Sequence, residues 1–340
     1  MIRLGIIGLN EGNGHPYSYS AIFNGFDESE LMKGCPFQMI KQYLPREHRN
    51  RVFIADAKIT HIWTQDEELS KSAARVAKIP NIVKNIEDLI GKVDGIILAR
   101  DDVGNHLKMA RPFIKAGLPL YIDKLLTPNL EELNELLTLA GKDYPLMACS
   151  SSRYHKLVEK AKQELDVNTT RTVHGTSRCT WIRYASHLLD GICLIFGTDV
   201  EYVQNVGRKG ADTVFIHYRN NLDVILQVIE DLALPIRFTC YSNKNAPYPV
   251  DFTDGPDHAE YFYSFVNMMK AFAGLVRTGI QPIPLEEIVK IAKIIIAGET
   301  SREQDGQKIY IAPHPRGTAK KQEYAEARGD SPRRSQRHRE

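Results

Sequence analysis

Short apolar runs separated by helix-like stretches dominate the first half of the chain. The runs at Arg3–Leu9, Ala57–Thr64, Val93–Ala99 and Leu118–Ile122 are rich in aliphatic residues, as in strands that are buried on both faces. The intervals between them have helical composition; Asn105–Ala116, for example, is followed by a glycine that can end a helix. This alternation predicts a doubly wound parallel sheet of the Rossmann type, with right-handed crossovers.

The second half has a different pattern. Strand-like runs follow one another between Arg171 and Tyr241 with few helical intervals, which is typical of an antiparallel sheet. Two amphipathic stretches, His258–Thr278 and Leu285–Ala297, then predict two helices. We therefore expect an α/β chain in which the Rossmann-type sheet is followed by a C-terminal α/β domain with a large, mainly antiparallel sheet.

The 340 residues are enough for two cores, and the patterns divide the chain into three parts. We predict a dinucleotide-binding domain over residues 1–125, a substrate and oligomerisation domain over 126–313, and a disordered tail over 314–340, whose polar composition cannot bury a core. Residues 25–56 interrupt the first alternation and indicate an insertion. This insertion could be functional structure beside a binding crevice, or surface padding or an oligomer contact.

Composition narrows the function classes. Up to Pro313 the chain has 36 basic and 38 acidic residues, so it lacks the basic excess of a nucleic-acid-binding protein. Its five cysteines form no C-x-x-C pair, which predicts reduced thiols rather than disulfides or a zinc site. No signal-like leader precedes the first strand, and no apolar run is long enough to cross a membrane. We expect a cytoplasmic protein without a metal and without membrane or nucleic-acid partners.

The first strand leads into a glycine- and asparagine-rich turn, Gly8–His15. A dinucleotide fingerprint, G-x-G-x-x-G, holds the pyrophosphate at the N-terminus of the following helix. This turn keeps the first glycine, carries Asn10 and Asn13 at the other two positions, and places Gly12 and Gly14 out of phase. The position directly after a buried strand favours a phosphate site, and a plain strand–helix turn is the alternative.

Two later segments give a more specific signal. One strand ends at Ala99 and leads through Arg100 to a helix beginning near His106. After that helix, a glycine turn and a further strand end in Asp123-Lys124-Leu125. This order resembles the glucose–fructose oxidoreductase, inositol dehydrogenase and rhizopine catabolism family (Gfo/Idh/MocA), in which the corresponding strand ends in Glu-Lys-Pro. The acid and the lysine match, and a leucine replaces the proline.

Further matches extend the resemblance to roughly residues 1–312. They are Arg153 after the next strand, a helix start with the pattern His187-x-x-Asp190, and a closing strand at Glu303–Ile311.

The resemblance implies catalytic roles for Lys124 and His187. Lys124 aligns with the family lysine beside the nicotinamide, which binds or polarises the substrate hydroxyl. A cation at the carboxyl end of a parallel strand can also stabilise an oxygen that gains negative charge. His187 aligns with the family's acid/base histidine, and an ordinary imidazole pKa of about 6.5 suits proton exchange near neutral pH. A surface lysine and a packed histidine are the alternatives.

One departure from the family pattern bears on the mechanism. The family often has an aspartate four residues before the histidine, and this chain has Arg183 there, followed by Tyr184. Tyr184 or Asp190 could take that role, or Arg183 could pair with an acid on the substrate. Asp190 could equally be an acid in the first turn of a helix. Together with Arg153, these residues are the predicted substrate-binding set.

Cofactor choice depends on the end of the second strand, where an acid would bind the ribose 2′-hydroxyl and select NAD. Thr64 holds that position, and Asp66 follows two residues later. Asp66 could reach the ribose, or a polar pair could accept the phosphate of NADP, so we expect NAD or NADP. His15 and His106 could line the crevice or cap helices. The predicted cofactor-binding residues are Gly8, Asn10, Gly12, Asn13, His15, Thr64, Asp66, Ala99, Arg100, His106, Asp123 and Lys124.

These features predict an NAD(P)-dependent oxidoreductase that transfers hydride between nicotinamide and a secondary alcohol of a sugar, nucleotide sugar, cyclitol or sugar acid. Two alternatives stay open. One is a glycosidase of the same family that uses NAD through a transient oxidation. The other is a dinucleotide-binding regulatory or partner-binding protein whose catalysis has decayed. The resemblance also implies a homodimer or homotetramer.

Overall fold

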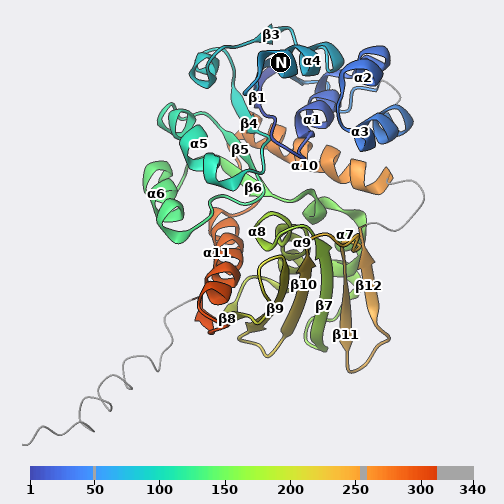
Figure 1. Cartoon of the computed structure of the whole chain (residues 1–340), viewed down its shortest axis with the longest axis vertical. Coiled ribbons are helices and arrows are strands. Elements are labelled where there is room, and N and C mark those ends of the chain that lie inside the picture. Colours follow the sequence, from blue (N-terminus) through green and yellow to red (C-terminus); the bar gives the residue numbers. More distant parts are fainter. Residues whose placement is uncertain (49–50, 253–258, 312–340) are drawn as a thin grey trace, which may run out of the picture.

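The chain forms two units, each built on one β-sheet (Figure 1). The computed structural model describes residues 1–48, 51–252 and 259–311, so the predicted tail lies outside the described residues. A six-stranded sheet forms the upper unit in Figure 1 and a seven-stranded sheet the lower one. The predicted α/β class, with a Rossmann-type sheet followed by a second large sheet, is confirmed.

The first sheet is parallel throughout, with the strand order β3-β2-β1-β4-β5-β6. Strands β4, β5 and β6 are buried along their whole length, which explains why their sequences are continuous apolar runs. The strand order reverses between β1 and β4, and this reversal opens a crevice at the carboxyl ends of those strands. The strands are β1 (Ile2–Ile7), β2 (Ala57–Trp63), β3 (Asn81–Ile82), β4 (Gly95–Leu98), β5 (Leu120–Asp123) and β6 (Leu146–Cys149).

Helices flank the first sheet, with α5 and α6 to the left in Figure 1 and α1, α2 and α3 to the right. The predicted insertion, residues 25–56, folds into α2, α3 and a short π-helical turn, η1. The helices are α1 (His15–Asn24), α2 (Glu28–Gly34), α3 (Gln38–Tyr43), α4 (Glu67–Val76), α5 (His106–Lys115) and α6 (Leu130–Ala140). The short turns are η1 (Leu44–His48), η2 (Ile86–Leu89), η3 (Val103–Asn105) and η4 (Ser151–Tyr154).

The second sheet has the order β12-β11-β7-β10-β9-β8-β13. Its neighbours are antiparallel except for β7 and β10, which confirms a mainly antiparallel sheet. The strands are β7 (Thr170–Arg178), β8 (Val200–Asn205), β9 (Ala211–Tyr218), β10 (Asp223–Ile229), β11 (Arg237–Ser242), β12 (Tyr248–Asp251) and β13 (Ile309–Tyr310). The helices are α7 (Lys156–Glu164), α8 (Trp181–Tyr184), α9 (Ser186–Phe196), α10 (Ala259–Thr278) and α11 (Leu285–Glu303).

The two units do not divide at the boundary expected from the sequence. Strand β6 pairs with β5, so the first sheet continues past Leu125 to Cys149. Helix α10, from the second half of the chain, returns to the first unit and contacts α1 and β1. The Tyr121 hydroxyl donates a hydrogen bond to Met268 Sδ of α10 at 3.3 Å. The predicted closing strand is shorter than expected, because Glu303 still belongs to α11.

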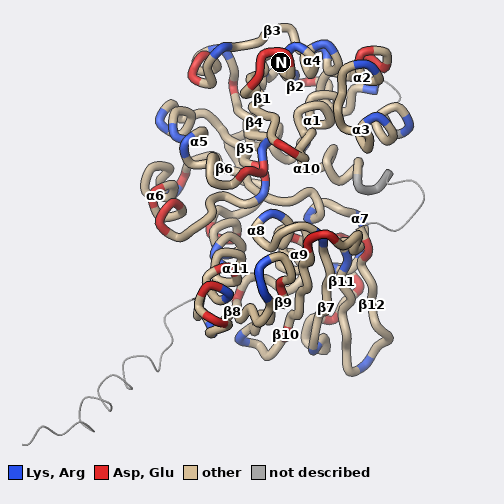
Figure 2. Tube along the Cα trace, viewed as in Figure 1, with Lys and Arg blue, Asp and Glu red and all other residues tan. Residues whose placement is uncertain are grey.

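Charged residues of both signs are intermixed along both units (Figure 2). Acidic and basic residues also occur together where the two units face each other. Within the described ranges, no helix combines the length and the apolar character that a bilayer crossing needs.

Candidate functional site

The turn between β1 and α1 lies at the crevice and is packed too closely for most side chains. A Cβ atom built on Gly8 would lie 2.2 Å from Pro16 Cγ and 3.2 Å from the Ala99 carbonyl oxygen. Gly12 has a φ of +76°, a conformation that side chains rarely adopt. Helix α1 begins at His15, so its N-terminus points to the same edge of the sheet. The turn therefore has the close backbone approach and the helix start of an anion site.

Side chains bridge the crevice from β1 to β4. Asn10 Nδ2 donates a hydrogen bond to Asp101 Oδ1 at 2.6 Å, and Arg183 Nη2 lies 2.9 Å from Asp101 Oδ2. Burial would raise the pKa of Asp101, but Lys124, Asn10 and Arg183 outweigh it and hold that pKa well below its usual range. Asp101 is therefore an anion that joins both units. Our sequence predictions did not include it.

Arg100 reaches across the carboxyl ends of the neighbouring strands. Its Nη1 atom donates to the Leu9 carbonyl oxygen at 2.6 Å and to Gln65 Oε1 at 3.0 Å, while Nη2 pairs with Asp102 at 2.5 Å. Gln65 also accepts a hydrogen bond from the Leu9 backbone nitrogen. Arg100 and Gln65 thus form one network across β1 and β2. Gln65 was not predicted, because it neither holds the strand-end position nor carries an acid that could bind a ribose.

The two residues predicted near the cofactor ribose have other partners. The Thr64 hydroxyl donates to the Asp66 carbonyl oxygen at 2.5 Å and is 2.9 Å from Ser70 Oγ. The Asp66 carboxylate caps α4 by accepting hydrogen bonds from the Glu68 and Leu69 backbone nitrogens. Both side chains are therefore engaged in starting α4.

His106 and Ala99 make hydrogen bonds that hold the backbone at the ends of β1, β4 and β5. His106 is fully buried, with Nδ1 2.7 Å from the Leu125 carbonyl oxygen and Nε2 2.9 Å from that of Arg100. The Ala99 backbone nitrogen donates to the Ile7 carbonyl oxygen at 2.8 Å. His106 thus positions the loops after β4 and β5 rather than facing the crevice.

Lys124 is buried between two carboxylates at the end of β5. Its Nζ atom lies 3.4 Å from Asp123 Oδ2 and 3.7 Å from Asp101 Oδ2. Asn13 Nδ2 donates to Asp123 Oδ2 at 3.1 Å, and His15 Nε2 lies 3.5 Å from the same oxygen. Burial lowers the pKa of His15, although Asp123 opposes the shift. The structure thus brings four predicted cofactor residues, Asn13, His15, Asp123 and Lys124, into one cluster.

His187 comes from α9 of the second unit and is buried, and its helix neighbours Ser186 and Asp190 line a small pocket together with Lys124. Its Nδ1 atom is 2.7 Å from Ser150 Oγ, and its ring packs edge-on against Tyr184 with 4.9 Å between ring centroids. Burial lowers the pKa of His187 well below its ordinary value, and the charge of Lys124 lowers it further. The imidazole is therefore neutral at neutral pH, where the sequence predicted a titration. Ser150, which the sequence did not point to, orients the ring.

Two of the predicted substrate residues lie behind Ser150. Asp190 Oδ2 accepts a hydrogen bond from the Ser150 backbone nitrogen at 2.7 Å, and burial raises the pKa of Asp190 to about 7. Arg153 Nη2 pairs with Glu287 Oε1 at 2.6 Å. Asp190 and Arg153 therefore support the loop that holds His187, whereas Arg183 and Tyr184 lie at the crevice.

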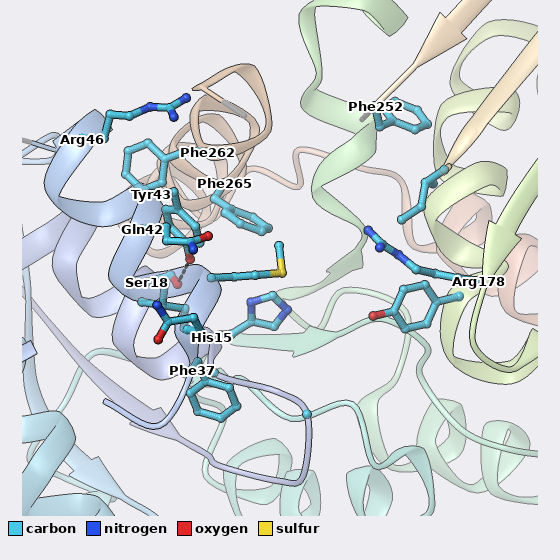
Figure 3. A pocket seen from close by; sticks show the side chains of 17 residues that line it. His15, Ser18, Phe37, Gln42, Tyr43, Arg46, Arg178, Phe252, Phe262 and Phe265 are labelled. Carbon is cyan, nitrogen blue, oxygen red and sulfur yellow. Dashed lines mark hydrogen bonds between the residues drawn. The ribbon is translucent and has the colours of Figure 1, made fainter. Parts of the chain in front are cut away.

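A cavity of about 900 Å³ opens beside the cluster, between the two units (Figure 3). His15 and Tyr184 lie on its wall, so the cavity reaches the neighbourhood of Lys124 and His187. The predicted insertion, residues 25–56, supplies much of the wall through Phe37 and residues of α3 and η1. The other contributions come from the Gly8–His15 turn, α1, α8, α10, the ends of β7 and β12 and the start of β11. The insertion therefore forms part of the wall of a cavity between the two units.

The crevice residues fit the diphosphate of a dinucleotide. Arg183 Nε is buried without a hydrogen-bond partner among the described residues. A Cβ atom on Gly12 would lie 3.6 Å from Arg183 Nη2, so this guanidinium faces the turn at the N-terminus of α1. A helix N-terminus and an incompletely bonded guanidinium both favour an anion. Within the described ranges, no group of three or more His, Cys, Asp and Glu side chains is arranged to hold a metal ion.

Residues 34–148 match a protein family described as an oxidoreductase family with an NAD-binding Rossmann fold, Gfo/Idh/MocA. This part of the chain is therefore similar to the NAD-binding Rossmann domain of the Gfo/Idh/MocA oxidoreductases. The Gfo/Idh/MocA match includes Lys124 and His106, and it begins after the Gly8–His15 turn and ends before His187. No curated protein matches the sequence.

Solved structures share the fold over nearly the whole chain. Myo-inositol 2-dehydrogenase from Lactobacillus plantarum superposes with a TM-score of 0.70 at 15% identity, covering 92% of this chain and 99% of its own. Scyllo-inositol dehydrogenase from Lactobacillus casei, with bound NAD(H) and scyllo-inositol, gives 0.69 at 12% identity, covering 92% and 99%. An oxidoreductase from Agrobacterium radiobacter in complex with NAD+, L-tartaric acid and magnesium gives 0.67 at 13% identity, covering 91% and 98%. At these identities the likeness shows the fold.

Proposed function

We propose that this chain is a dehydrogenase that uses a nicotinamide dinucleotide, NAD or NADP, to oxidise a secondary alcohol or reduce the corresponding ketone. The observation that carries the proposal is that Lys124 and His187 are both buried and that Lys124 lines a small pocket together with Ser186 and Asp190, the neighbours of His187 on α9. Lys124 and His187 come from different units, and the site lies at the carboxyl edge of a Rossmann sheet. The family match and the dehydrogenases of similar fold support the proposal.

The proposed cofactor site follows the crevice. The Gly8–Gly14 turn and Arg183 would hold the diphosphate, Gln65 and Arg100 would face the adenosine end, and Asp123 with Lys124 would lie at the nicotinamide end. Asn10 and Arg183 now bridge the crevice to Asp101, so they would exchange that carboxylate for cofactor atoms. The dinucleotide, when bound, supplies the hydride acceptor or donor.

The remaining chemistry belongs to residues of this chain. Oxidation of an alcohol to a ketone removes a hydride from carbon and a proton from oxygen. Lys124 holds the oxygen and stabilises the negative charge that develops there, because a fixed cation in a buried site needs little reorganisation. His187 is neutral and can accept the proton, and Ser150 keeps the ring oriented through Nδ1. Reduction of the ketone runs the same transfers in reverse.

Two measurements on the full-length protein test this proposal. Titration with NADH and NADPH, followed by nicotinamide fluorescence, should show saturable binding. Secondary alcohols from the sugar, cyclitol and hydroxy-acid classes should then reduce the dinucleotide, and the Lys124→Met and His187→Asn variants should lose that turnover while still binding NADH. Binding without turnover across the panel would identify a regulatory protein instead. The predicted homodimer or homotetramer stays a prediction.

A further inference from the structure

We infer that the cavity beside His15 is the substrate site and that it takes a hydroxy acid with an apolar or aromatic body, rather than a polyol. This inference rests on the proposed dehydrogenase and specifies its substrate. The cavity holds about 900 Å³, enough for a ligand larger than a single sugar ring.

The cavity wall is mainly aromatic and aliphatic. Phe262 and Phe265 from α10, Phe37 before α3 and Phe252 after β12 face into it in Figure 3. Ser18 and Tyr43 hydrogen-bond to each other, and the other uncharged polar lining residues are Gln38, Gln42, Tyr184 and His15. A polyol would leave hydroxyl groups against the aromatic part of this wall without hydrogen-bond partners, which disfavours polyol binding. An apolar body would instead release water from the wall.

The charge of the cavity favours an anion. Two arginines, Arg46 and Arg178, line it from opposite units, and no carboxylate is found among its described lining residues. The Arg178 side chain makes no hydrogen bond or ion pair with the described part of the chain, unlike that of Arg183, which pairs with Asp101. A guanidinium with no protein carboxylate beside it is suited to a ligand carboxylate, which it can hold through two parallel hydrogen bonds.

Arg178 also lies on the same cavity wall as two neighbours of the proposed catalytic pair. His15 belongs to the Lys124 cluster, and the Tyr184 ring packs against His187 with 4.9 Å between ring centroids. A carboxylate on Arg178 therefore brings a hydroxyl on the neighbouring carbon toward His187 and Lys124. The apolar body then extends along Phe265 and Phe262 toward Arg46. The Arg46 side chain is exposed to solvent at that end of the cavity.

Calorimetry on the full-length protein saturated with NADH tests the inference with four probes. These are 3-phenyllactate, its neutral amide 3-phenyllactamide, lactate and myo-inositol. We expect 3-phenyllactate to bind at least about 10-fold more tightly than each of the others, since loss of a charged hydrogen bond or of the apolar body costs about that factor. Arg178→Gln should remove the preference for the acid over the amide. Arg171→Gln, on the same strand but outside the cavity, is the matched control and should change nothing.

A second variant tests the same preference for an anion independently, in case Arg178→Gln does not fold. Met39 is 60% exposed and lines the cavity, so Met39→Glu should fold and weaken 3-phenyllactate binding through charge repulsion while leaving the amide unaffected. The inference is overturned if myo-inositol or lactate binds as tightly as 3-phenyllactate, if 3-phenyllactate does not bind, or if it displaces NADH. Binding of 3-phenyllactate without any turnover would instead contradict the proposed dehydrogenase and leave the anion site standing.

Discussion

Arg183 of the second unit and Asp101 of the first form an ion pair, with 2.9 Å between Nη2 and Oδ2, across the crevice where a dinucleotide is proposed to bind. Arg183 stands where the family often has an aspartate, so the residue that departs from the pattern is the one that links the units. Asp101 in turn contacts Lys124. If the dinucleotide binds in this crevice, we expect its binding to be coupled to the contact between the units through these side chains.

The first prediction concerns Arg183. If its guanidinium holds the diphosphate, Arg183→Gln should weaken NADH binding by about 10-fold, the value of one charge-assisted hydrogen bond. Titration by nicotinamide fluorescence measures this affinity, and Arg171→Gln is the control. Tighter NADH binding by Arg183→Gln would show instead that the ion pair closes the crevice against the cofactor.

A second prediction concerns Gly8. The added methyl group in Gly8→Ala would overlap Pro16 Cγ, so the start of α1 must shift. We expect a stability loss of about 1–3 kcal/mol, the usual cost of overpacking, together with weaker NADH binding. Thermal unfolding and titration measure the two effects. Gly104→Ala is the control, because a Cβ atom there meets nothing within 4 Å. An unchanged NADH affinity in a destabilised Gly8→Ala protein would place the cofactor elsewhere.

The third prediction separates the chemical role of Lys124 from its structural one. Lys124→Met should lower kcat/KM by about 10²-fold, as for loss of one oxyanion donor. It also leaves Asp101 and Asp123 without their shared cation, so the melting temperature should fall. Adding Asp101→Asn should recover melting temperature without recovering turnover. Recovery of turnover in the double variant would show that Lys124 serves only to neutralise the acids.

The fourth prediction concerns the pH dependence of His187. The pKa is lowered on folding, so below about 6.5 the unfolded chain takes up a proton that the folded chain resists, and stability falls as the pH falls. His187→Asn should therefore lose less melting temperature than the wild type between neutral pH and the mildly acidic range. Its kcat/KM should drop by about 10²–10⁴-fold. His174→Asn, an exposed histidine on β7, is the control. A wild-type activity limb near pH 6.5 that disappears in His187→Asn would contradict the lowered pKa.

The sequence by itself determined the two sheets and the Gly8–His15 turn. It also indicated Lys124 and His187 as candidate catalytic residues. The spacing of apolar residues within a short segment indicates whether that segment forms a strand or a helix. The apolar runs therefore located most strands and helices to within a few residues. The sequence also marked residues 25–56 as an insertion, but only the fold placed it on the wall of a cavity.

Only the tertiary structure decided which side chains meet. Asp101 bonds to Asn10, 91 positions earlier, and to Arg183, 82 positions later, and neither spacing leaves a local pattern in the sequence. Asp66 looked available for a ribose, yet the start of α4 uses its carboxylate. The pKa of His187 is likewise set by burial between the two units and by the charge of Lys124. Charge interactions depend on distance in space and on exclusion of water, and the chain acquires both only when the two units pack together.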